Sequence, residues 1–85
     1  MISVKCLGHI GSSVGAKEVE LPGESIDAEE IIARVRGLST EAEPGFTKYN
    51  TLVLVEDGEA FVPSGQGRVV KSGQKVVLIP FSHGG

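Results

Sequence analysis

The final four residues, Ser82-His83-Gly84-Gly85, carry the group with the clearest potential for chemistry. A terminal carboxyl group has an unperturbed pKa of ~3.5, so that of Gly85 is ionised at neutral pH and is a poor acyl donor until it becomes a mixed anhydride. Gly84 and Gly85 have no Cβ atom, so they fit a narrow channel and reach φ values that are closed to other residues. Four extended residues span at most roughly 13–14 Å. The ending therefore predicts a flexible tail, residues 82–85, that presents Gly85 inside another protein's site.

Other candidate residues do not assemble into a catalytic site. Cys6 and His9 have a Cys-x-x-His spacing that could suit a metal or a nucleophile with its base. Their odd separation puts them on opposite faces of a strand, so we expect Cys6 in the core and His9 at the surface, near a strand end. Glu29 and Glu30 are adjacent and do not face each other on a helix, which argues against a carboxylate dyad. We predict no metal site, no cofactor bound by the chain itself and no enzymatic activity.

Composition describes one small globular domain, predicted to span residues 1–81. A chain of 85 residues builds a single core but no deep enclosed active site. One cysteine permits no internal disulfide and fits a reducing compartment, which favours the cytoplasm. No apolar segment has the length of a signal peptide or of a membrane span, so no membrane association is expected. A net charge of −3 argues against nucleic acid as a direct partner.

The charges are unevenly distributed along the chain. All eleven acidic side chains lie at or before Glu59, and the only later charged side chains are Arg68, Lys71 and Lys75. These three residues either solvate a loop and a strand edge or form a basic rim beside the tail that docks an acidic partner. Both interpretations remain open from the sequence.

Five segments have the alternation or composition of β-strands. They are Ile2–Ile10, Lys17–Leu21, Thr51–Glu56, Glu59–Val62 and Val76–Phe81. The glycine-rich stretch Gly8–Gly15 matches no nucleotide-binding motif and is interpreted as a hairpin loop between the first two strands. Asp57-Gly58 predicts a second hairpin. The nearly unbroken apolar run at the end predicts a central strand that is buried on both sides.

Residues Asp27–Leu38 show the clearest helix signal. Asp27 is a good N-cap, and Glu30 three residues later completes a capping-box pattern. Acidic residues follow the cap, and Arg34 and Arg36 lie near the end, as the helix dipole favours. One apolar stripe faces the core. Its members are Ala28, Ile31, Ile32, Val35 and Leu38.

One helix among these strands predicts an α+β fold, a mixed sheet of four to five strands with the helix packed on one face. The last strand must run beside the first for both apolar runs to be covered. If Val76 and Leu78 face the helix, then Ile79, Phe81 and Leu7 form an exposed apolar patch near the tail, a candidate interface. The alternative is that both faces of the sheet are covered.

Strand order, size and ending together resemble the ubiquitin-like β-grasp group of sulfur carriers and modifiers. This group includes the molybdopterin-synthase small subunit, the thiazole-synthesis sulfur carrier, the ubiquitin-related modifier and the archaeal small modifier proteins. The likeness is carried by the capped helix Asp27–Leu38, the hairpin segment Val53–Gly58 and the closing stretch Lys71–Gly85. Gly73-Gln74 stands where many members have Gly-Asp, and Phe81 follows Pro80 where some have a second proline. The His-Gly-Gly ending is most similar to that of the ubiquitin-related modifier.

The resemblance implies that the chain is the protein substrate of an ATP-dependent, E1-like activating enzyme. That enzyme would supply ATP and magnesium and form an acyl-adenylate at Gly85. A persulfide donor would then yield a thiocarboxylate, or a cysteine a thioester. The partners implied are the activating enzyme, a sulfur donor or acceptor protein, and target proteins joined through lysine. The uses implied are sulfur transfer, such as tRNA thiolation, and conjugation. Ser82, His83 and Gly84 would be recognised with the carboxylate.

Two rival interpretations remain open from the sequence. Within the family, the chain could be the small subunit of molybdopterin synthase, which donates sulfur during molybdenum-cofactor synthesis. In another class, it could be a small five-stranded β-barrel that binds a peptide or nucleic acid. The acidic balance and the few aromatic residues, three Phe and one Tyr, argue against base stacking.

Overall fold

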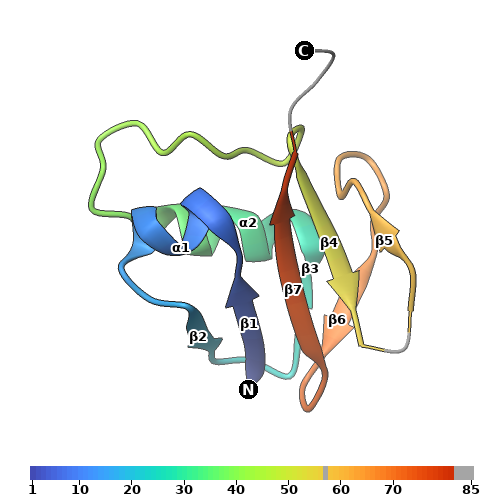
Figure 1. Ribbon diagram of the computed structural model, residues 1–85. Helices are drawn as coiled ribbons and strands as arrows, with labels where there is room; N and C mark the ends of the chain where they lie inside the picture. Colours follow the sequence, from blue (N-terminus) through green and yellow to red (C-terminus); the bar gives the residue numbers. More distant parts are fainter. Residues whose placement is uncertain (57, 82–85) are drawn as a thin grey trace.

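The computed structural model of the protein describes residues 1–56 and 58–81 and shows a sheet with helices on one side (Figure 1). Asp57 and the predicted tail residues Ser82, His83, Gly84 and Gly85 lie outside the described residues. The elements in chain order are β1 (Ile2–Cys6), α1 (Gly8–Val14), β2 (Glu18–Leu21), β3 (Ser25–Asp27), α2 (Ala28–Gly37), β4 (Thr51–Val55), β5 (Ala60–Phe61), β6 (Val69–Lys71) and β7 (Lys75–Pro80). The fold is therefore α+β, as predicted.

The main sheet has the strand order β2-β1-β7-β4-β5. Strand β7 lies between β1, to which it is parallel, and β4, to which it is antiparallel. The prediction that the last strand runs beside the first is confirmed. A second, two-stranded sheet pairs β3 with β6, and neither of these short strands was predicted. The main sheet is open, with β2 and β5 at its edges, so the β-barrel interpretation is wrong.

Helix α2 begins and ends as the sequence indicates. The carboxylate of Asp27 accepts a hydrogen bond from the backbone N–H of Glu29 at 2.8 Å, which confirms Asp27 as the N-cap. Glu30 pairs with Arg34 at 3.2 Å, one helical turn later, and among the described residues it makes no hydrogen bond to the N–H of Asp27, so the predicted capping box does not form. Residues Ile31, Ile32 and Val35 are buried, whereas Leu38 lies beyond the last helical residue and is 48% exposed. The charged residues at the two ends of α2 and its buried apolar face therefore both stabilise a helix in this segment.

The prediction of a loop over Gly8–Gly15 is wrong, because residues Gly8–Val14 form helix α1 and β1 ends at Cys6. Ile10 and Ser13 are buried at helical spacing, and Val14 packs against the core. At Gly11 a Cβ atom would lie 2.8 Å from the carbonyl oxygen of Cys6, so glycine permits the close approach of α1 to β1. Gly15 ends the helix in the left-handed conformation. Tertiary packing thus outweighs the low helix propensity of this segment.

One face of the main sheet, here called the inner face, forms the core with the helices. Its fully buried side chains include Ile2, Val4, Val53, Val76 and Leu78. They belong to one apolar cluster that includes Ile10 of α1 and Ile31 of α2. Phe46, from the long connection between α2 and β4, is completely buried in the same cluster. The core therefore lies on one side of the sheet.

Strand β7 does not have two buried faces. Val76 and Leu78 are buried, but their neighbours Val77 and Ile79 are only half-buried. The prediction of a strand covered on both sides is therefore wrong, because the described residues place α1 and α2 against the inner face. The hairpin of β4 and β5 is confirmed, with Val53 opposite Phe61, although β5 is shorter than the predicted Glu59–Val62.

Among the described residues, no helix is long and apolar enough to cross a membrane.

Candidate interaction site

The residues predicted to carry the chemistry follow directly after the central strand. Ser82, His83, Gly84 and Gly85 lie outside the described residues, but the point where they are attached is described. Phe81, the residue after β7, donates its backbone N–H to the carbonyl of Asn50 at 3.0 Å. Pro80 packs against the first turn of α1, since a Cβ atom on Gly8 would lie 3.2 Å from the Cγ atom of Pro80. The chain therefore leaves the sheet from a position held by α1 and by the start of β4.

The other face of the main sheet, here called the outer face, carries aliphatic side chains beside this point. The register of β4 and β7 pairs Leu52 with Ile79 and Leu54 with Val77. Leu7 directly follows the neighbouring strand β1, and its N–H bonds to the carbonyl of Leu78 at 3.1 Å, which places Leu7 next to this pair. We call Leu7, Leu52, Leu54, Val77 and Ile79 the outer apolar patch. Leu7 is 36% exposed and the other four are half-buried.

The outer apolar patch agrees with the exposed patch expected from Leu7 and Ile79. Phe81 follows the same alternation as Ile79 and is half-buried. Sequence reasoning missed Leu52 and Leu54. No sequence signal separated them, because all five residues of Thr51–Val55 are β-formers and the inner and outer positions look alike. The docking role of these residues stays a prediction.

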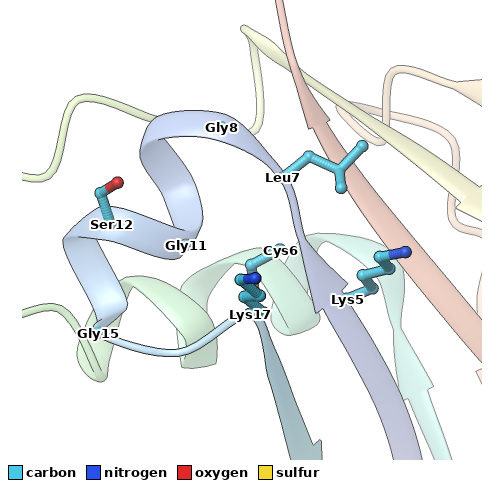
Figure 2. A pocket seen from close by; sticks show the side chains of 8 residues that line it. All are labelled: Lys5, Cys6, Leu7, Gly8, Gly11, Ser12, Gly15 and Lys17. Atoms are coloured by element: carbon cyan, nitrogen blue, oxygen red, sulfur yellow. The ribbon is translucent and has the colours of Figure 1, made fainter.

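Two lysine side chains, Lys5 and Lys75, border the patch. A groove of about 470 Å³ lies between the end of β1, helix α1 and the start of β2, and Lys5 lines it together with Lys17, which lies opposite Cys6 (Figure 2). In Figure 2, Lys5 and Leu7 extend from β1 toward β7. Lys75 and Lys5 also line a second hollow of about 270 Å³ beside Val77. Within the described residues, none of these three ammonium groups has an ion pair. The acidic residues Glu18 and Glu56 line the same part of the surface, so the outer face combines apolar contacts with charges of both signs.

The predicted basic rim beside the tail is wrong in its placement. Lys71 and Lys75 flank the turn that precedes β7, at the end of the sheet where the amino group of Met1 bonds to Ser72 at 2.7 Å. Figure 1 shows the start and the end of β7 on opposite sides of the molecule. Arg68 lies over the ring of Phe61, 4.2 Å from its centroid, at the β5 edge. Lys71 and Lys75 are close to the tail in sequence but far in space from the point where it is attached, because the whole length of β7, at roughly 3.3 Å per residue, lies between them and that point.

Cys6 and His9 do not form a site. Cys6 is 4% exposed on the inner face, and burial raises the pKa of its thiol above the ordinary value of 9.0. His9 is exposed, as expected, but it lies on α1 rather than at a strand end. The described residues contain no group of three or more histidine, cysteine or acidic side chains arranged to hold a metal ion.

The element order and sheet described above define the ubiquitin-like β-grasp fold, in which the last strand lies in the middle of the sheet beside the first. Two solved structures match the chain over 99% and 100% of its length. The resemblance to the ubiquitin-like β-grasp group that was found in the sequence is therefore confirmed.

The first of these structures is SAMP1 from Haloferax volcanii, with a TM-score of 0.59 and 21% sequence identity over 99% of this chain and 98% of that one. The second is CysO, in the complex of BexX and CysO from Amycolatopsis orientalis, with a TM-score of 0.62 and 25% identity over all of both chains. No protein-family model matches the chain. No curated protein matches it either.

Proposed function

We propose that the protein is a ubiquitin-like sulfur carrier or modifier whose working group is the carboxylate of Gly85. In this proposal an ATP-dependent, E1-like enzyme activates the carboxylate, and the product serves sulfur transfer, such as tRNA thiolation, or conjugation to lysine. The observation that carries the proposal is the position of the strand that precedes Ser82–Gly85. It is the central strand β7, its end is held by Gly8 and Asn50, and the outer apolar patch lies beside that end.

The proposed chemistry needs no catalytic group on this chain. A carboxylate oxygen of Gly85 attacks the α-phosphorus of ATP, pyrophosphate leaves, and an acyl-adenylate forms. The terminal sulfur of a protein persulfide then attacks the carbonyl carbon and AMP leaves, which gives an acyl disulfide. A second thiol attacks the disulfide and releases the thiocarboxylate. In the conjugation branch, a cysteine thiolate displaces AMP to give a thioester, and the amine of a target lysine displaces that thiolate.

The outer apolar patch is the surface by which the activating enzyme would hold the folded body. Isolated exposed aliphatic residues are common on proteins, but here four on β4 and β7 lie together with Leu7, the residue that follows β1, and form one apolar surface. Lys5 and Lys75 at its border, with Glu18 and Glu56 beside them, would favour an enzyme surface that carries charges of both signs around an apolar centre. Ser82, His83 and Gly84 would then reach the adenylation site, with glycine giving the narrowest possible passage.

The mass of the protein purified from its own cells tests the proposal. Replacement of one oxygen of Gly85 by sulfur would support sulfur transfer, and a branched peptide through Gly85 would support conjugation. A deletion of Gly84-Gly85 should abolish function in the cell and leave the unfolding transition unchanged, because these residues follow the folded sheet. Arg34→Gln, an exposed change on α2, is the matched control that should keep function. Full function of the deletion variant would refute the proposal.

A further inference from the structure

Another hollow, distinct from the two described above, lies on the helical side of the molecule, away from the outer face of the sheet. It has a volume of about 220 Å³ and lies between α2 and the residues that lead into β4. Glu29, Ile32, Ala33 and Arg36 line it from the helix, and Thr47, Lys48 and Tyr49 line it from the connection. We call it the α2 pocket. Ile32 and Ala33 lie three and four residues after Glu29 and four and three before Arg36, so all four share one face of α2.

The wall formed by the connection is fixed in place. Phe46 anchors the segment in the core, and Asn50 accepts a hydrogen bond from the N–H of Thr47 at 2.7 Å. The N–H of Tyr49 bonds to the hydroxyl of Thr47 at 3.1 Å. Lys48 lies 2.9 Å from a carboxylate oxygen of Glu29, which ties the segment to the helix. The pocket therefore exists before any ligand binds, and little conformational entropy is lost on binding.

The charged side chains around the pocket differ in whether they are paired. Glu29 is paired with Lys48, and the hydrogen bond and the charge of that carboxylate raise the pKa of Lys48 above 10.5. Arg34, on another face of α2, pairs with Glu30 and with the carbonyl of Pro22. Within the described residues, the guanidinium of Arg36 has neither an ion pair nor a hydrogen bond. The charge available at the pocket is thus the planar cation of Arg36, which binds carboxylates through two parallel hydrogen bonds.

The apolar part of the pocket suits a single side chain. Its volume is below the roughly 300–1,000 Å³ of sites for drug-sized ligands. Ile32 forms a buried floor and is 2% exposed, whereas Tyr49 is 58% exposed at the rim. Tyrosine and arginine are the residues that most often dominate protein interfaces. An aliphatic side chain fits between Ile32 and Tyr49, with a carboxylate beside it on Arg36.

We propose that the α2 pocket binds a segment of another protein in which an aliphatic residue is next to Asp or Glu. The proposal does not depend on the chemistry of Gly85. Because the pocket lies on the opposite side from the outer apolar patch, a protein bound there would leave the patch open to a second partner.

The test is a titration of the isotope-labelled protein with a capped Ser-Leu-Glu-Ser peptide, followed by the amide NMR spectrum. We expect millimolar binding, with shifts confined to residues of α2 and of the segment from Thr47 to Tyr49. Arg36→Gln should weaken binding roughly tenfold, because a charge-assisted hydrogen bond is lost. Ala33→Leu should block binding by filling the pocket, and leucine is a good helix former at this exposed position.

The matched control is Arg34→Gln, which removes the same charge from another face of α2 and should leave binding unchanged. A Ser-Leu-Gln-Ser peptide that binds equally well would overturn the proposal, and so would shifts located elsewhere or no shift at millimolar peptide. Concentration-dependent shifts at the pocket without peptide would show that the occupant is a second copy of the chain, which also contradicts it. None of these outcomes bears on the mass of Gly85, so failure here is distinct from failure of the carrier proposal.

Discussion

The two faces of the main sheet are built from the same strands but differ in what covers them. Leu78 and Ile79 are neighbours on β7 and chemically similar, yet Leu78 is completely buried under the helices and Ile79 is half-exposed on the outer face. The inner face carries the apolar area that stabilises the fold, and the outer face keeps aliphatic area that folding has not covered. This difference indicates that stability and partner binding depend on alternate residues of one strand.

The largest expected effect is loss of stability on the inner face. Leu78→Ala should lower the free energy of unfolding by roughly 2–5 kcal/mol, because it removes buried contacts and leaves a cavity. Ile79→Ala, the adjacent substitution, should cost about 1 kcal/mol or less, because its site is already partly hydrated. Urea denaturation of both variants measures the two costs. Equal losses would show that the outer face is as well packed as the inner one.

The next effect concerns binding at the outer face. Ile79→Asp should leave the fold intact and reduce kcat/KM for adenylation by the activating enzyme roughly 30-fold, which corresponds to the ~2 kcal/mol of an interface hot spot. The reason is that a charge in the middle of the outer apolar patch must be desolvated on docking. Ala60→Asp, an exposed change on edge strand β5, is the control. If Ile79→Asp were adenylated as well as the wild type, the patch would have no docking role.

A smaller effect is expected where the helix begins. Asp27→Ala should lower the free energy of unfolding by about 1 kcal/mol, because the N–H of Glu29 loses its capping acceptor. Asp27→Asn keeps an acceptor at the same position and should recover most of that loss. Thermal unfolding of the two variants provides the measurement. An unchanged transition in Asp27→Ala would mean that the cap contributes nothing and that packing alone holds α2 on the inner face.

The smallest effect is a pH dependence that originates on the inner face. Burial raises the pKa of Cys6 above 9.0, so the folded protein holds this proton more tightly than the unfolded chain does. This contribution to stability is complete below pH 9 and is lost as the pH rises through the folded-state pKa. Stability measured from pH 8 upward should therefore fall less in Cys6→Ala than in the wild type. Parallel curves for the two proteins would contradict the assignment.

Local patterns in the sequence determined much of the fold. The cap at Asp27 with the stripe Ile31–Val35, the alternation of β2 and the run of β-formers in β4 each specify one element, because periodicity, capping and composition act over a few residues. The apolar run of β7 predicted a central strand correctly. It did not distinguish Val77 and Ile79 from Val76 and Leu78, since a run of apolar residues has no period that separates the two faces.

The sequence by itself determined the α+β fold with its central last strand, from a capped helix and an apolar closing run. Tertiary structure decided the rest. Helix α1 forms because Gly11 allows it to pack against β1, and Lys71 and Lys75 lie far from Phe81 because β7 runs the length of the sheet between them. Leu52 joins Ile79, and Arg36 is left beside Tyr49, only through contacts between distant segments. Such contacts depend on strand order and packing, which local patterns do not encode.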